Sequence, residues 1–171
     1  MRTILLALLF TLSTGAFAKS FEFEIAAGKK LIVETHEDSD QVLIDFTLAG
    51  KPTQTEKRIG DALVALDYNG KSQSVQAIDL DGDGTKEILV RALYIPIGVV
   101  RVFKFDAATG KFSRLKFGRK KEDGVPVPPR AIVQVRTDGT LQFAGGLGKK
   151  PQRMEIPWKN GQYVFPARPA K

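Results

Sequence analysis

Three observations predict an all-β protein. Short segments of alternating apolar and polar residues recur along the chain, and turn-forming dipeptides separate them. No segment carries the long apolar repeat of 3.6 residues that an amphipathic helix needs. We therefore expect an antiparallel sandwich, barrel or meander of about ten hairpin-connected strands. The 171 residues are too few for a complete propeller, whose blades take roughly 40 residues each.

The first 18 residues have the pattern of a secretory signal peptide. Arg2 supplies a positive charge, residues 4–10 are apolar, and residues 16–18 read Ala-Phe-Ala, an A-x-A cleavage pattern. The apolar run is shorter than the roughly 20 residues that span a bilayer, and an uncleaved membrane anchor is the alternative. We expect cleavage, a periplasmic or secreted protein that is not transmembrane, and a single β domain over residues 19–171.

The following segments are expected to form strands, beginning with residues 21–25. These alternate Phe-Glu-Phe-Glu-Ile, as in a strand with one buried face. Residues 62–68 and 71–78 flank Asn69-Gly70, a dipeptide suited to the positive φ angles of a type I′ hairpin turn. The expected strand segments are 21–25, 30–35, 41–48, 62–68, 71–78, 88–94, 99–105, 111–117, 131–135, 140–143, 154–158 and 162–165.

Residues 88–94 are strongly apolar and predict a central strand. Trp158 and Tyr163 flank the last turn, where we expect them to pack in the core. Beyond Asn69-Gly70, hairpin turns are expected at residues 106–110, at Asp138-Gly139 and at Asn160-Gly161.

Two other segments are predicted to be loops. Residues 51–60 are polar, and residues 118–130 combine a basic run with Val-Pro-Val-Pro-Pro, in which proline cannot donate to a strand ladder. The candidate partner surface consists of Arg119, Lys120, Lys121 and Arg130. A solvated basic face is the alternative. We do not expect a nucleic-acid partner, because strand alternation puts at least one of the nearby Phe112 and Phe117 in the core rather than on a stacking platform.

Composition excludes several classes of chemistry. The absence of cysteine excludes a disulfide framework, a thiol nucleophile and cysteine-based metal sites. The formal net charge of +7 favours an anionic partner. The alternative is that the charge serves only to keep the protein soluble. We interpret His36, the only histidine, as a surface residue, because no Gly-x-Ser-x-Gly element accompanies it.

Residues 79–87 read Asp-Leu-Asp-Gly-Asp-Gly-Thr-Lys-Glu and predict a metal-binding loop. The spacing matches the first nine positions of an EF-hand loop, including the glycine at position six. Alternate residues of a curled loop point to one centre, which suits an ion with six to eight oxygen ligands. Position twelve is Val90 rather than glutamate, and predicted strands flank the loop, so a helix–loop–helix sensor is excluded. The candidate ligands are the carboxylates of Asp79, Asp81, Asp83 and Glu87 and the carbonyl of Thr85.

This motif resembles the calcium loop of FG-GAP and VCBS-type repeats, which joins two β-strands and closes with an acidic residue at position nine. Residues 102–112 are similar to the hairpin that often follows such loops. Size, export and the loop-plus-hairpin order are also similar to periplasmic lysozyme inhibitors of the invertebrate type. The resemblance implies Ca²⁺ as cofactor with the same ligand residues. A solvated acidic turn is the alternative, and Mg²⁺ suits this many carboxylates less well.

These observations together lead to an expected function. We expect an exported, calcium-binding, non-enzymatic envelope protein that binds another protein or an anionic polymer. The resemblance implies a periplasmic lysozyme inhibitor as one alternative. A glycan hydrolase that uses carboxylates is a further alternative, because the spacing of such a pair is set by the fold.

Overall fold

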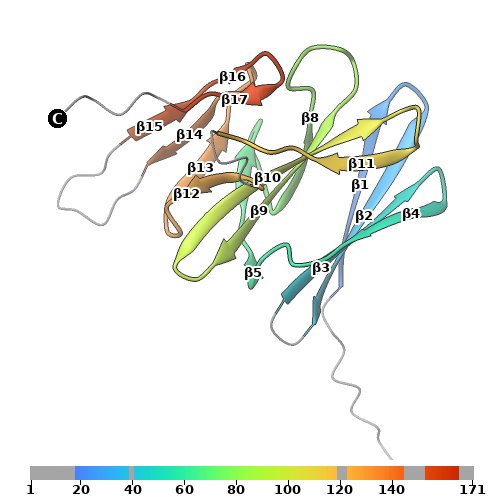
Figure 1. The fold of residues 1–171 in the computed structure, drawn as a ribbon, viewed down its shortest axis with the longest axis horizontal. Coiled ribbons are helices and arrows are strands. Elements are labelled where there is room, and N and C mark those ends of the chain that lie inside the picture. The colour runs from blue at the N-terminus through green and yellow to red at the C-terminus, as the bar shows by residue number, and fades with distance from the viewer. Residues whose placement is uncertain (1–17, 39–40, 119–122, 145–152, 166–171) are drawn as a thin grey trace, which may run out of the picture.

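The computed structural model describes residues 18–38, 41–118, 123–144 and 153–165, and all of the regular structure in them is β-strand. The predicted all-β class is therefore confirmed (Figure 1). No helix in these ranges has the length and apolar character needed to cross a membrane. The predicted signal peptide lies outside the described residues apart from Ala18, and the prediction of its cleavage stays a prediction.

Three open sheets and one short hairpin make up the fold. Sheet A has the order β1-β2-β3-β4, with β1 (Lys19–Ala26), β2 (Lys29–Asp38), β3 (Gln41–Leu48) and β4 (Lys51–Glu56). Sheet B has the order β11-β10-β9-β5, with β12 beside β10 and β8 beside β9. Its strands are β5 (Ala62–Leu63), β8 (Val75–Ile78), β9 (Glu87–Tyr94), β10 (Ile97–Asp106), β11 (Lys111–Arg114) and β12 (Val125–Val127).

Sheet C has the order β15-β14-β13-β6-β7 and contains the only parallel pair among the described strands, β13 with β6. Its strands are β6 (Leu66–Tyr68), β7 (Lys71–Gln73), β13 (Ile132–Val135), β14 (Leu141–Ala144) and β15 (Arg153–Ile156). A separate hairpin joins β16 (Trp158–Lys159) to β17 (Gln162–Tyr163). The predicted antiparallel pairing is otherwise confirmed by the strand registers.

Sheet B lies between sheets A and C, so the molecule has three layers and two cores (Figure 1). In β9, Ile88 and Val90 join the core shared with sheet A, whereas Leu89 joins the core shared with sheet C. Residues that alternate along a strand point to opposite faces, and both faces of β9 are covered. This explains why residues 88–94 are apolar apart from Arg91, and it confirms the predicted central strand.

Two arginines are buried in the central sheet. Arg91 on β9 is 3 % exposed, and its guanidinium donates to the carbonyls of Ala65 and Ala131, each at 2.6 Å. Arg101 on β10 is 5 % exposed and donates to the carbonyl of Ile59 and the hydroxyl of Tyr94. Burial lowers the pKa of both guanidinium groups below the ordinary value. These side chains tie the central sheet to backbone carbonyls of residues outside its strands.

Gly60 marks a point where the segment after β4 touches β9. A Cβ atom at this position would lie 2.6 Å from the carbonyl oxygen of Leu93 and 2.7 Å from the Cβ of Ala92. We expect Gly60→Ala to destabilise the protein by about 1–3 kcal/mol, because backbone atoms have to shift. Urea unfolding measures this difference, and a midpoint equal to that of the wild type would show that the segment adapts freely.

The predicted hairpin turns are confirmed. Asn69 and Gly70 have φ angles of 46° and 73°, as their turn type requires. The turn between β10 and β11 is held by Asp106, which accepts hydrogen bonds from the amide of Ala108 and the hydroxyl of Thr109. Asp138-Gly139 and Asn160-Gly161 lie in the turns of β13–β14 and β16–β17, respectively. Trp158 and Tyr163 pair across the last hairpin and are both buried, as predicted.

The predicted loop at residues 51–60 is wrong in its first half, which forms the edge strand β4. Its side chains are polar because one face of sheet A is open to solvent. Gln54 reaches across to the next layer and exchanges hydrogen bonds with the backbone of Phe112. Two expected single strands are also wrong. Residues 62–68 divide into β5 of sheet B and β6 of sheet C, and residues 71–78 divide at Ser74 into β7 of sheet C and β8 of sheet B.

The predicted exposed loop at residues 118–130 contains a strand as well. β12 pairs with β10, and Val125 and Val127 are buried while Pro126 between them is exposed. Proline has no amide hydrogen to donate. It is tolerated in β12 because, among the described strands, β12 pairs only with β10, so its other edge carries no strand hydrogen bonds that proline would remove. The segment is therefore partly core, and the prediction of a wholly exposed contact loop needs correction.

Candidate metal centre

The acidic loop connects β8 to β9 at one end of sheet B (Figure 1). Gly82 and Gly84 have φ angles of 75° and 84°, a region that disfavours residues with a side chain. Both carboxylate oxygens of Asp79 accept amide hydrogen bonds, from Gly82 at 2.8 Å and from Gly84 at 3.0 Å. The two glycines therefore let the backbone curl around the first aspartate, as the motif predicts.

Asp83 closes a second small turn within the loop. Its Oδ1 atom accepts the amide of Thr85 at 2.7 Å, and this hydrogen bond is the main reason that the pKa of Asp83 is below the ordinary value. At the loop's end, the amide of Lys86 donates to the carbonyl of Ile25 on β1 at 2.7 Å. The loop is thus held by its own carboxylates and by a contact with sheet A.

Glu87 is the first residue of β9 and is completely buried, with 0 % exposure. Its Oε2 atom accepts the amide of Leu80 at 3.0 Å, whereas its Oε1 atom is buried and has no hydrogen-bond partner among the residues that the structure describes. Burial is the largest cause of the raised pKa of this carboxyl group. A buried carboxylate is costly unless a cation compensates its charge.

The structure brings three of the predicted ligands together. Asp79, Asp81 and Glu87 each offer a carboxylate oxygen, and these oxygens all lie within 4.8 Å of one another. Two oxygens bound to one Ca²⁺ at about 2.4 Å are separated by at most twice that distance. The three oxygens are therefore close enough together to bind the same ion. Asp83 is not part of this triad, because its side chain turns to the amide of Thr85. The roles of Asp83 and of the Thr85 carbonyl as ligands stay predictions.

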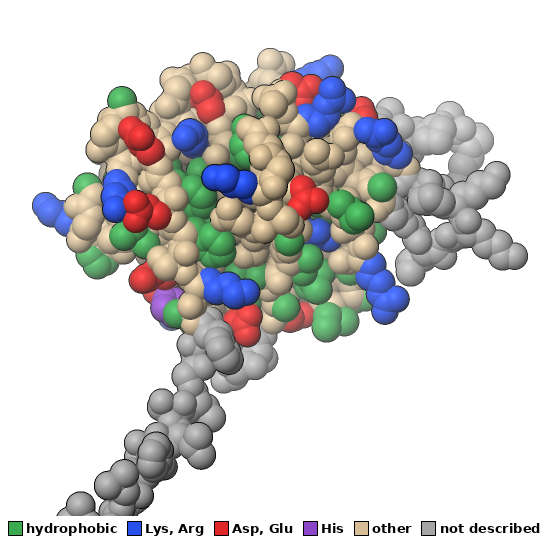
Figure 2. All heavy atoms as spheres, turned by 180° about the vertical axis from the view of Figure 1, so that it is seen from behind, with side chains coloured by type: hydrophobic (Ala, Val, Ile, Leu, Met, Phe, Trp, Pro, Cys, Tyr) green, Lys and Arg blue, Asp and Glu red, His purple; other side chains and the backbone are tan. Residues whose placement is uncertain are grey.

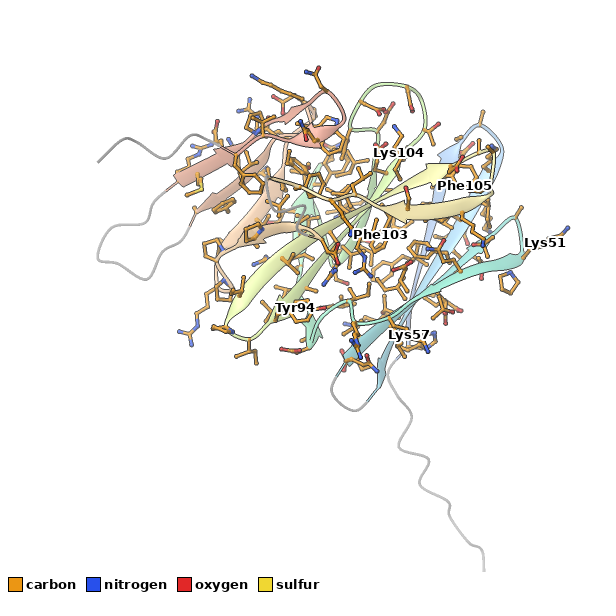
Figure 3. The ribbon with its side chains drawn as sticks, viewed as in Figure 1. Lys51, Lys57, Tyr94, Phe103, Lys104 and Phe105 are labelled. Carbon is orange, nitrogen blue, oxygen red and sulfur yellow. The ribbon has the colours of Figure 1, made fainter. Side chains whose placement is uncertain are left out.

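Lys104 on β10 is a site residue that the sequence analysis missed. Its ammonium lies 2.5 Å from Asp81 Oδ2, 3.3 Å from Glu87 Oε1 and 3.5 Å from Asp83 Oδ2. In Figure 3 this side chain points toward the loop between β8 and β9. The hydrogen bond to Asp81 is the largest cause of the raised pKa of Lys104.

The position of Lys104 follows from the β9–β10 register. Phe103 pairs with Ile88, so one further step places Lys104 opposite Glu87. Opposite charges at facing positions of two strands stabilise the pair. The turn length between the two strands was the signal that could have revealed this residue, because it determines the register.

The loop is also anchored in the core shared by sheets B and C. Leu80 is 6 % exposed and lies among the buried residues of that core. An added Cβ at Gly139 would lie 3.2 Å from Leu80 and 3.1 Å from Trp158, so the β13–β14 turn packs closely on both. The hydroxyl of Tyr163 donates to the carbonyl of Gly139 at 3.0 Å. Trp158, the only tryptophan of the chain, therefore lies close to the acidic loop, because both Trp158 and Leu80 pack against Gly139.

His36 lies away from the acidic loop, on the solvent-facing side of sheet A. Its Nε2 atom is 3.0 Å from Asp45 Oδ2, and both side chains are partly exposed. The hydroxyl of Thr55 donates to Asp45 rather than to His36. The interpretation of His36 as a surface residue agrees with its 34 % side-chain exposure, and no hydroxyl of the described residues donates to its imidazole.

The structure describes only part of the predicted basic surface. Arg119, Lys120 and Lys121 lie outside the described residues, and Arg130 is exposed just after β12. Nearby, Arg114 pairs with Glu56 at 2.7 Å and with Asp123 at 3.5 Å. On the face drawn in Figure 2, basic side chains are interspersed with acidic ones. Acidic side chains therefore compensate part of the positive charge around residues 118–130.

Comparison of the chain with protein-family models, with curated proteins and with solved structures found no match.

Proposed function

We propose that this protein binds one divalent cation at Asp79, Asp81 and Glu87, and that the cation is Ca²⁺. The observation that carries this proposal is Glu87 Oε1, which is fully buried beside the two aspartates, has no hydrogen-bond partner among the described residues and has only the partly exposed Lys104 ammonium, at 3.3 Å, as a compensating charge. An acidic turn that serves only to expose carboxylates to water would not bury one of them in this way. A cation bound at the cluster supplies the missing interaction.

The ligand set favours calcium over other metals. The candidate ligand atoms of Asp79, Asp81 and Glu87 are all carboxylate oxygens, which suits the hard cations Ca²⁺ and Mg²⁺ rather than zinc or copper. Mg²⁺ demands a near-ideal octahedron and retains several waters, whereas Ca²⁺ accepts many carboxylates in an irregular loop. The curled backbone between Asp79 and Glu87 provides such a loop.

The proposed role of the ion is to stabilise the fold. It joins the start of β9 to a loop whose Leu80 side chain packs in the core. Extracellular calcium modules have Kd values of about 10⁻⁴–10⁻³ M, so they fill where calcium is plentiful. At 100 times Kd, binding adds about 2.7 kcal/mol to the free energy of unfolding. This fits the export that residues 1–18 predict.

We further propose that the calcium-stabilised domain is a non-enzymatic binding protein of the cell envelope. Its net charge of +7 supports an acidic protein or an anionic polymer as the partner. A pull-down from envelope extract, run with calcium and with chelator, tests this claim. Calcium-dependent capture of one such partner is expected, and turnover of a glycan substrate by the purified protein would contradict a purely binding role.

Replacement of Asp81 by alanine tests the ligand assignment. We expect calorimetric titration to show a loss of Ca²⁺ affinity of at least about 10-fold, because one of three converging carboxylates is removed. Asp106→Ala is the matched control, since Asp106 lies in another turn, outside the cluster. Wild-type affinity in the Asp81 variant would show that the ligands are assigned wrongly.

A further inference from the structure

The carboxylate cluster already contains a cation that belongs to the chain itself. The ammonium of Lys104 contacts one oxygen from each of Asp81, Asp83 and Glu87. Two of these residues, Asp81 and Glu87, are also members of the triad whose oxygens converge. A positive charge fixed at these groups and a divalent ion bound by them would repel each other strongly.

We propose that Lys104 is an internal competitor for the metal, which occupies the site in the calcium-free protein and leaves it when calcium binds. This inference depends on the proposed function, because it concerns the affinity of the same site. Lys104 then has two effects of opposite sign. It stabilises the calcium-free fold, and it weakens calcium binding.

The charges at the site show why an exchange of cations is favourable. One ammonium compensates only one of the negative charges on Asp79, Asp81, Asp83 and Glu87. It also leaves Glu87 Oε1 without a hydrogen bond, although Nζ lies 3.3 Å away. A divalent ion supplies twice the charge and binds carboxylate oxygens at about 2.3–2.6 Å. Calcium therefore completes interactions that the ammonium makes only in part.

The position of Lys104 allows its ammonium to leave the carboxylate cluster at a small cost in free energy. Its side chain is 35 % exposed, so the ammonium can rotate into water and regain its hydration without opening the core. Arg91 has no such path, because its side chain is 3 % exposed and donates to buried carbonyls. Lys104 thus differs from the permanently buried arginines of the same sheet.

Substitution of Lys104 by glutamine separates the two effects. We expect Lys104→Gln to bind Ca²⁺ at least about 10-fold more tightly than the wild type in calorimetric titration. In chelator the same variant should melt at a lower temperature than the wild type, while the rise in Tm on adding calcium should be larger. Lys51→Gln removes the same charge from an exposed position on β4, and we expect it to leave both quantities unchanged.

The outcomes distinguish this inference from the proposed function. Binding by the wild type with an equal affinity in Lys104→Gln would overturn the competition while leaving calcium binding intact. Absence of binding in both proteins at millimolar calcium would overturn the proposed function itself. Binding by Lys104→Gln alone would support the competition and show that the natural chain excludes calcium.

A second experiment needs no variant. Acetylation of the wild-type protein, followed by mass spectrometry of its peptides, measures how accessible each lysine is. We expect the reaction at Lys104 to be slow in chelator and several-fold faster with saturating calcium, relative to Lys51 in the same sample. If calcium binds by calorimetry but the rate at Lys104 stays constant, the ammonium does not leave the site and the inference is wrong.

Discussion

Replacing Glu87 by glutamine is expected to remove the stabilisation by calcium without weakening the calcium-free fold. Glutamine keeps the size of the side chain and an oxygen that can accept the amide of Leu80. It removes the negative charge, whose burial is the largest cause of the raised pKa of Glu87. The variant also loses the 3.3 Å ion pair with Lys104, but that ammonium is partly exposed and keeps its contact with Asp81. We expect the relief of a desolvated buried charge to outweigh the lost pair, so in chelator the variant should be at least as stable as the wild type.

In calcium the order of stability reverses. If the variant binds calcium about 100-fold more weakly, a concentration of 100 times the wild-type Kd stabilises it by only about 0.4 kcal/mol, against about 2.7 kcal/mol for the wild type. Thermal melts of both proteins in chelator and in calcium measure the difference. Glu87→Ala is the informative contrast, because it loses the hydrogen bond to Leu80 as well and should be destabilised even in chelator. Wild-type stabilisation of Glu87→Gln by calcium would show that this carboxylate is not a ligand.

Replacing Arg91 by methionine is expected to cause the largest loss of stability of any single change considered. Methionine retains an apolar stem of similar length, but it leaves the carbonyls of Ala65 and Ala131 without their donors at 2.6 Å. Each buried acceptor that loses its partner costs about 1–3 kcal/mol, so a total of about 2–6 kcal/mol is expected for the two carbonyls. Both carbonyls belong to segments that connect sheet B with sheet C. The junction between these layers should therefore loosen.

Urea unfolding followed by the fluorescence of Trp158 measures this effect, since Trp158 lies in the core that sheets B and C share. Arg153→Met is the control, because that side chain is 70 % exposed on β15 and its loss should change the free energy of unfolding by less than about 0.5 kcal/mol. An unfolding midpoint of Arg91→Met equal to that of the control would contradict a structural role for the buried guanidinium.

Features that depend on neighbouring residues were predictable from sequence. The turns at Asn69-Gly70 and Asn160-Gly161 need positive φ angles, which the local residues provide. The same is true of the acidic loop, where Gly82 and Gly84 allow the curl. Residues 88–94 were identified as a central strand because burial on both faces leaves a pattern that is apolar apart from Arg91.

Features that depend on pairing with distant residues were not predictable. The strand β4 is polar and resembles a loop, and only its register with β3 and the link from Gln54 to Phe112 make it a strand. Residues 71–78 divide between two sheets because β7 pairs with β6 and β8 pairs with β9. Neither partner can be chosen from a local pattern of apolar and polar residues.

The candidate site shows the same division. Asp79, Asp81 and Glu87 share one short motif, and the structure brings their oxygens together. Lys104 is separated from that motif by a hairpin, so its place beside Glu87 depends on the β9–β10 register. The burial of Glu87, which is the main argument for a bound ion, depends in turn on the layers that cover sheet B.

A crystal structure from calcium-rich solution, with anomalous diffraction data that identify the element, tests the central claim most directly. The account predicts a calcium peak in contact with carboxylate oxygens of Asp79, Asp81 and Glu87 at about 2.3–2.6 Å, with the ammonium of Lys104 turned toward solvent. A map without such a peak, in which Lys104 still contacts Asp81 and Glu87, would contradict it.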